Sequence, residues 1–276
     1  MLKTRVITAL VLLAILFPVL YSGSMLAFAA VSTLFFGAAM WESQRLFKKP
    51  APVLMAVIWA SLFLYILLSN ISLSKPALPL LFVVCVLFWC VRLVPSLVFG
   101  LPVVASYSSG ILSGMYAVNI FGCFVAMAVL FLHSPGFLFS TMAIVWVADI
   151  GAYFSGKAFG KHKLAPTISP GKSWEGAIGG WILVLIFGAG STAISVFHDT
   201  APTQIFERFG WVGFVAVMTT LSVASVVGDL FESLLKRRAG MKDSSALLPG
   251  HGGVLDRIDA LIPVIPIVAF LDLWWK

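Results

Sequence analysis

Residues 233–259 read Ser233-Leu-Leu-Lys236-Arg237-Arg238-Ala-Gly-Met-Lys242-Asp243-Ser-Ser-Ala-Leu-Leu-Pro249-Gly250-His251-Gly252-Gly253-Val-Leu-Asp256-Arg257-Ile-Asp259, a polar segment between two apolar runs. If the first run continues to residue 238 as a helix, four polar side chains share one helix face: Asp229, Glu232, Ser233 and Lys236. Asp256 and Asp259 are likewise one turn apart at the start of the second run. The segment predicts two helix ends with carboxylates, joined by a basic, glycine-containing loop. Such an arrangement can hold a divalent cation beside a polyphosphate.

The composition determines the class of protein. Apolar residues make up 61% of the 276 residues, charged residues only 11%, and the mean hydropathy is +1.05. A soluble core of this size cannot bury so much apolar surface, so we predict an all-α, polytopic integral membrane protein. We expect a single membrane domain over residues 1–276, with amino-terminal helices in 1–132 and both polar motifs in 133–276.

Apolar runs near the length that a membrane helix needs predict about nine spans. They cover residues 6–21, 24–41, 51–69, 77–93, 110–132, 136–156, 177–197, 209–230 and 257–275. Pro95, Gly100 and Pro102 interrupt 94–109, which we expect to be an interfacial segment. Lys3, Arg5 and Ala27-Phe28-Ala29 resemble a secretory signal, but the apolar sequence continues into a second span, which favours an uncleaved first helix.

The positive charges predict the orientation of these spans. With a cytoplasmic amino terminus, only Lys75, Arg208 and Lys276 lie outside. Fifteen lie inside: Lys3, Arg5, Arg45, Lys48, Lys49, Arg92, Lys157, Lys161, Lys163, Lys172, Lys236, Arg237, Arg238, Lys242 and Arg257. This bias follows the positive-inside rule and places both polar loops in the cytoplasm. It also explains the net charge of +7 without nucleic-acid binding.

A second polar stretch runs from Asp149 to Gly176. Asp149 lies inside a predicted span, where a carboxylate faces either a wet cavity or a buried lysine partner; we expect the cavity. Gly171-Lys172-Ser173 is not a P-loop, because Pro166 stands where the first glycine is required and no βαβ unit surrounds it. Instead, Ser169 or Ser173 can cap the next helix, and Pro170 suits its first turn. Lys172 then lies at the start of that helix, where the backbone favours anions.

Simpler explanations exist for several of these residues. Lys236, Arg237 and Arg238 could be a juxtamembrane basic cluster that attracts anionic lipid. Such a cluster does not require the neighbouring carboxylates, nor Gly252-Gly253, whose backbone N–H groups can form an anion nest. His251 either contacts phosphate or caps the loop.

Three further expectations concern packing. Gly110/Gly114, Gly156/Gly160 and Gly176/Gly180 have the spacing of close helix contacts. His133 and His198 should be surface residues. Cys85, Cys90 and Cys123 lie in apolar runs and should be buried thiols rather than disulfides or metal ligands.

The segment 233–259 resembles the signature of the phosphatidate cytidylyltransferases (CDP-diacylglycerol synthases). The matching pattern is a serine, Lys-Arg, Lys-Asp, Pro-x-His-Gly-Gly and Asp-Arg-x-Asp at the family's spacing. The stretch 149–176 is similar to the family's second block, which begins Asp-x-x-Ala-Tyr and ends Ser-Pro-x-Lys-(Ser/Thr)-x-Glu-Gly. Together the two blocks cover about a fifth of the chain.

The resemblance implies CMP transfer from CTP to phosphatidic acid in a bacterial cytoplasmic (inner) membrane, giving CDP-diacylglycerol and pyrophosphate, with the active site at the cytoplasmic face. The residues suit this reaction. A phosphomonoester is largely deprotonated at neutral pH, so the nucleophile needs charge neutralisation rather than a general base.

The family pattern implies Mg²⁺ at Asp229 and Asp256, with a monovalent cation such as K⁺ as a helper. Oxygen ligands favour Mg²⁺ over zinc independently. Ser233, Lys236 and Asp256 are the expected catalytic residues. The expected contacts to CTP or to the lipid phosphate are Ser169, Lys172, Arg237, Lys242, His251 and Arg257. The family's fold also implies a homodimer.

Other functions fit less well. In a transporter, Asp149 would be a coupling site, but the charges gather at one membrane face. A CDP-alcohol phosphatidyltransferase requires an Asp-Gly dipeptide, which this chain lacks. A CTP-dependent polyprenol kinase, which shares the nucleotide and the membrane setting, is the closest alternative.

Overall fold

The computed structural model describes residues 2–69, 77–104 and 106–275. Its long helices are α1 (Leu2–Ser22), α2 (Met25–Leu46), α3 (Pro52–Leu68), α4 (Ala77–Phe88), α6 (Tyr107–His133), α7 (Pro135–Phe159), α8 (Trp174–Thr192), α9 (Ala201–Ala239) and α11 (Leu261–Trp275). The shorter elements are a π-helical turn (Trp89–Leu93), α5 (Val94–Phe99), β1 (Lys163–Ala165), β2 (Ser169–Ser173), a 3-10 turn (Ser195–Phe197) and α10 (Leu255–Ile258).

The helices agree with the predicted membrane protein. Within the described residues, six helical segments are long and apolar enough to cross a bilayer, and three more apolar helices are shorter: Val6–Ser22, Pro52–Leu68 and Leu261–Trp274. Each of the nine predicted ranges overlaps one of these helices. The helical class is confirmed, while nine crossings and their orientation remain predictions. Of the charges used for orientation, Lys75 and Lys276 lie outside the described residues.

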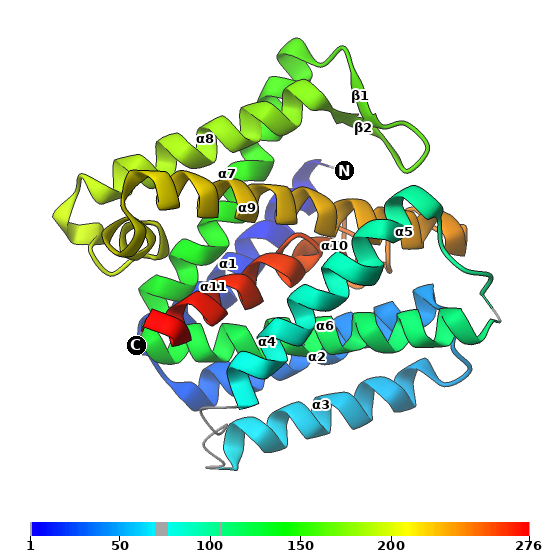
Figure 1. Cartoon of the computed structure of the whole chain (residues 1–276). Helices are drawn as coiled ribbons and strands as arrows, with labels where there is room; N and C mark the ends of the chain where they lie inside the picture. The colour runs from blue at the N-terminus through cyan, green and yellow to red at the C-terminus, as the bar shows by residue number, and fades with distance from the viewer. Residues whose placement is uncertain (1, 70–76, 105, 276) are drawn as a thin grey trace.

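The core forms around α6 and α11. Most of α6 is buried, and α11 packs against α6, α4 and α9 in the middle of the bundle (Figure 1). Aromatic side chains fill the gap between α2, α3 and α6, where the ring of Phe36 lies 5.0 Å from Phe63 and 5.2 Å from Phe124. The final apolar run is therefore surrounded by other helices, which fixes the start of α10 and α11 beside the end of α9.

Glycines bring α7 and α8 into close contact. A Cβ on Gly151 would lie 2.9 Å from the Cα of Gly180, and one on Gly176 would lie 2.9 Å from the Ala152 carbonyl oxygen. The predicted close packing is confirmed for this helix pair. It is wrong for Gly114, where a Cβ would meet no atom of another segment within 4 Å.

Several local predictions need correction. Residues 163–173 form an antiparallel hairpin, so Pro170 lies in β2 rather than in a helix. Ser173, not Ser169, caps α8 by accepting from the Gly176 N–H at 3.1 Å. The helix of α4 continues through the π-helical turn to Phe99, so the first part of 94–109 extends that helix. Likewise α9 begins at Ala201, eight residues early, with a kink at Gly210 (φ +63°).

His133 was wrongly expected at the surface. Its side chain is 17% exposed and lies between two carboxylates, 2.7 Å from Asp272 and 3.0 Å from Asp199. His198 is exposed as expected. All three cysteines are free thiols; Cys85 and Cys123 are buried, whereas Cys90 is exposed.

Candidate active site

The carboxyl-terminal part of α9 carries the predicted polar face. Ser233 donates to Asp229 Oδ1 at 3.2 Å, one helical turn away, and Lys236 forms an ion pair with Glu232. The helix then stops at Gly240, whose φ of +75° is the left-handed conformation typical of a helix end. The one-face arrangement of Asp229, Glu232, Ser233 and Lys236 is confirmed.

Asp256 joins this face to the loop that follows. Lys236 Nζ donates to its Oδ1 at 2.6 Å, and the backbone N–H groups of Ser244 and Gly253 donate to its Oδ2 at 2.9 and 2.8 Å. Burial raises the pKa of Asp256, but the Lys236 ammonium and the backbone donors outweigh it, so the pKa lies below the ordinary value. Asp256 is therefore held as a carboxylate between α9 and the loop.

Glu42 near the end of α2 was missed from the sequence. Its side chain is fully buried, and each carboxylate oxygen takes one hydroxyl and one backbone N–H. Oε1 accepts from Ser245 (2.5 Å) and Val254 (3.1 Å). Oε2 accepts from Ser244 (3.2 Å) and Leu255 (2.6 Å). The one sequence feature that could have indicated Glu42 is a lone carboxylate near the end of an apolar helix. No neighbouring residue indicates its partners, which lie about 200 residues away in the sequence.

Gly253 shows how tightly this loop is built. A Cβ there would collide with Ser244 Oγ and with the Glu42 carboxylate. The glycine pair that was predicted as an anion nest has a different role here, because the Gly253 N–H already donates to Asp256. The loop is thus folded inward around two carboxylates, Glu42 and Asp256.

A polar cavity of about 450 Å³ lies between α7, α8, α9 and the hairpin. Asp149 and Asp229 both line it, together with Lys172, whose Nζ lies 2.5 Å from Asp229 Oδ2. The prediction that Asp149 faces a polar cavity is confirmed, and Asp229 of the candidate site lines the same cavity; that the cavity joins the active site stays a prediction. Ser222 and Ser225 of α9 add hydroxyl groups to the same wall.

A second cavity, of about 710 Å³, lies at the loop and the start of α1. Lys242, Asp243, His251 and Arg257 line it, and Arg257 donates to the His251 carbonyl oxygen at 2.6 and 3.1 Å. The predicted substrate contacts therefore divide between two places: Lys172 lies at the α7–α9 cavity, and Lys242, His251 and Arg257 lie at the loop cavity. On α9, Lys236 is two turns beyond Asp229.

Two predicted contacts have other roles in this structure. Arg237 Nε donates to the Ile168 carbonyl oxygen at 3.2 Å and so ties the hairpin to α9. Ser169 lies in β2, opposite Ala165, and lines none of the cavities described here.

Comparison with known proteins gives the family. The model of the cytidylyltransferase family matches residues 3–274. The chain belongs to this family. It is 39% identical to the phosphatidate cytidylyltransferase of Pseudomonas aeruginosa over 99% of this chain and 97% of that protein. The Haemophilus influenzae phosphatidate cytidylyltransferase is 36% identical over 98% of each chain. A Bacillus subtilis phosphatidate cytidylyltransferase is 37% identical over 58% of this chain.

The carboxylates of the site suit the hard cation that the family pattern implies. Among the residues that the structure describes, no three His, Cys, Asp or Glu side chains gather as a metal site. Mg²⁺ is commonly held by one or two carboxylates plus substrate phosphates, so a larger protein cluster is not required. Asp229 forms an ion pair with Lys172, and Asp256 forms one with Lys236. Both carboxylates therefore already bind a positive charge.

Proposed function

We propose that this protein transfers CMP from CTP to phosphatidic acid, giving CDP-diacylglycerol and pyrophosphate. Family membership and near full-length relatives of that name support the proposal. The structural observation that carries it is a pair of lysine–carboxylate contacts: Lys172–Asp229, which lines the α7–α9 cavity, and Lys236–Asp256, which joins α9 to the loop that lines the second cavity. This combination suits a reaction between two polyanions at a helix end.

In this reaction a phosphate oxygen of phosphatidic acid bonds to the α-phosphorus of CTP. The bond from that phosphorus to the bridging oxygen of the β-phosphate breaks, and pyrophosphate leaves with the electron pair. The attacking phosphate is largely dianionic at neutral pH, since its second pKa is about 6. The chain therefore has to position two like-charged groups and offset the charge that moves onto pyrophosphate.

The basic residues have distinct places in this scheme. Lys172 in the α7–α9 cavity and Lys236 on α9 are the candidates to neutralise the triphosphate. Lys242, His251 and Arg257 offer positive or donor groups at the loop cavity. Ser233 can donate to a phosphate oxygen instead of to Asp229.

Mg²⁺ at Asp229 and Asp256, with K⁺ as a helper, would neutralise phosphate charge when bound. Each carboxylate now holds a lysine ammonium. A cation at these carboxylates would compete with both lysines; it would leave Lys172 available to phosphates, whereas Lys236 would keep its ion pair with Glu232. Removal of Mg²⁺ should accordingly abolish turnover.

The setting of the reaction is also part of the proposal. The positive-charge bias supports nine spans with a cytoplasmic amino terminus in a bacterial inner membrane, and it favours a site at the cytoplasmic face. The implied homodimer belongs to the same proposal.

The decisive experiment gives the purified protein CTP labelled in the α-phosphate, with phosphatidic acid and Mg²⁺. Label in a lipid product and stoichiometric pyrophosphate are expected. Labelled CDP with a phosphorylated polyprenol would indicate a kinase instead, and no transfer to phosphatidic acid would refute the proposal.

A further inference from the structure

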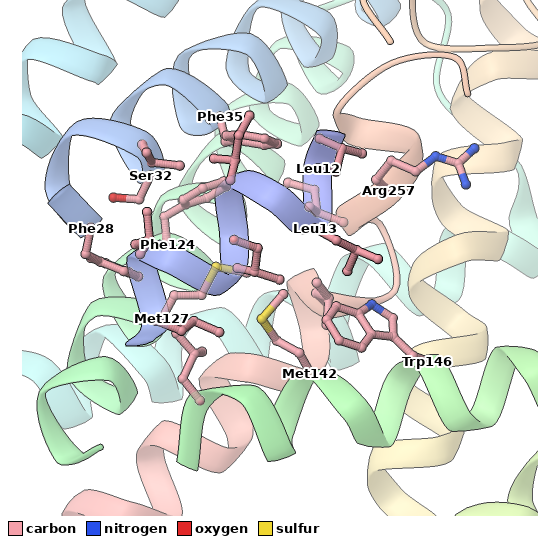
Figure 2. A pocket seen from close by; sticks show the side chains of 18 of the residues that line it. Leu12, Leu13, Phe28, Ser32, Phe35, Phe124, Met127, Met142, Trp146 and Arg257 are labelled. Carbon is pink, nitrogen blue, oxygen red and sulfur yellow. The ribbon is translucent and has the colours of Figure 1, made fainter. Parts of the chain in front are cut away.

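An apolar cavity of about 400 Å³ separates α1 from α2, α6 and α7. Side chains from all four helices line it, among them Leu12, Phe28, Phe124 and Met142 (Figure 2). Leu16 of α1 also lines it. The hydroxyl of Ser32, one of its few polar groups, already donates to the Ala29 carbonyl oxygen. This cavity thus suits a hydrocarbon ligand rather than the nucleotide.

One end of the apolar cavity is basic. Figure 2 shows Arg257 at the opposite side of the cavity from Phe28 and Met127. Arg257 and His251 line this cavity and also the polar loop cavity, so the two spaces meet at these residues. Thr8 on α1 donates to the Pro249 carbonyl oxygen at 2.7 Å, which anchors the start of α1 to the loop.

The length of the apolar cavity matches one leaflet of a bilayer. Its α1 wall extends from Ala9 to Leu20, about 16 Å at 1.5 Å per residue. Half of a hydrocarbon core of about 30 Å is about 15 Å. A chain in this space would run along α1, away from the loop.

We propose that the α1 cavity holds one acyl chain of the lipid substrate, with its phosphate group at His251 and Arg257. The proposal rests on the proposed function and adds a chain-length limit set by the length of the α1 wall. Charge complementarity selects the occupant: a phosphate-bearing lipid satisfies the basic end and the apolar body together. An uncharged lipid offers no anion to this basic end.

The test compares two leucine-to-tryptophan variants on the same helix. Leu16 lines the cavity and is half-buried, whereas Leu10 is 60% exposed and does not line it. CMP transfer is measured with dioleoyl and with dioctanoyl phosphatidic acid. L16W should lower kcat/KM about tenfold for the dioleoyl lipid, with less than a twofold change for the dioctanoyl lipid and for the KM of CTP. L10W should change neither.

Other outcomes would overturn the assignment. If L16W lowers kcat/KM equally for both lipids, Leu16 has only a structural role. If L16W leaves kcat/KM unchanged for both lipids, the acyl chain binds elsewhere. A wild-type protein that transfers CMP to neither lipid would instead refute the proposed function.

A second measurement needs no variant. Wild-type protein is irradiated with a phosphatidic acid that carries a diazirine in the middle of one acyl chain, and the labelled peptides are identified. Labels on α1, α2 and α7 that dioleoyl phosphatidic acid displaces are expected. Labels confined to α3 or α4, or insensitive to competition, would contradict the proposal.

Discussion

Replacing Glu42 by glutamine should disable the site without touching any predicted substrate contact. Both Glu42 oxygens accept one hydroxyl and one backbone N–H. In either orientation of the glutamine, its amide NH₂ must face the N–H of Val254 or of Leu255. A serine hydroxyl can turn and accept, but a backbone N–H cannot.

The cost follows from these contacts. One buried N–H loses its acceptor, which costs about 1–3 kcal/mol, and the remaining bonds become neutral rather than charge-assisted. We expect a loss of roughly 3 kcal/mol in the free energy of unfolding of this region. Because Ser244 bonds both Glu42 and Asp256, the position of Asp256 should change as well, and CMP transfer should fall at least tenfold.

The assay measures thermal unfolding and CMP transfer of E42Q in detergent. Glu207, which is exposed, provides the matched control E207Q, and wild-type values are expected for it. An E42Q protein with wild-type melting temperature and turnover would refute the view that Glu42 organises the loop.

Two further predictions follow from the geometry of the site, and a third follows from the distribution of positive charge. D229N and D256N should each reduce turnover at least 100-fold at saturating Mg²⁺, and K236A should be similarly impaired; an active D256N protein would contradict the metal assignment. R238A should retain most activity but melt earlier, because Arg238 stacks 4.8 Å from the Phe47 ring and donates to Pro102 and Ser109, away from Asp229; a larger loss of activity than in K236A would contradict this ranking. Single cysteines introduced near Lys49 and Lys163 should resist an impermeant reagent added from outside, whereas one near Asp199 should react, and outside labelling of the first two would reverse the topology.

Local periodicity predicted the part of the site that lies on α9. Positions 229, 232, 233 and 236 follow the helical repeat, so their shared face required only that the helix continue past the apolar run. The structure confirms this with the Ser233–Asp229 and Lys236–Glu232 contacts. The extent of the helices was harder to predict, because proline and glycine can either end a helix or lie within one. Here the helix that begins with α4 continues past Pro95, and α9 continues past a kink at Gly210.

Contacts between distant segments could not be predicted from single residues. The Lys236–Asp256 pair spans 20 residues, whereas the Glu42 contact with Leu255 spans 213. Apolar helices carry little information about which neighbours they meet, so Glu42 looked like the polar end of a span. Yet burying a carboxylate there is tolerable only because four donors converge on it. The amino-terminal helices therefore contribute directly to the candidate site: α2 orders the loop between α9 and α10 through Glu42, and α1 is tied to that loop through Thr8.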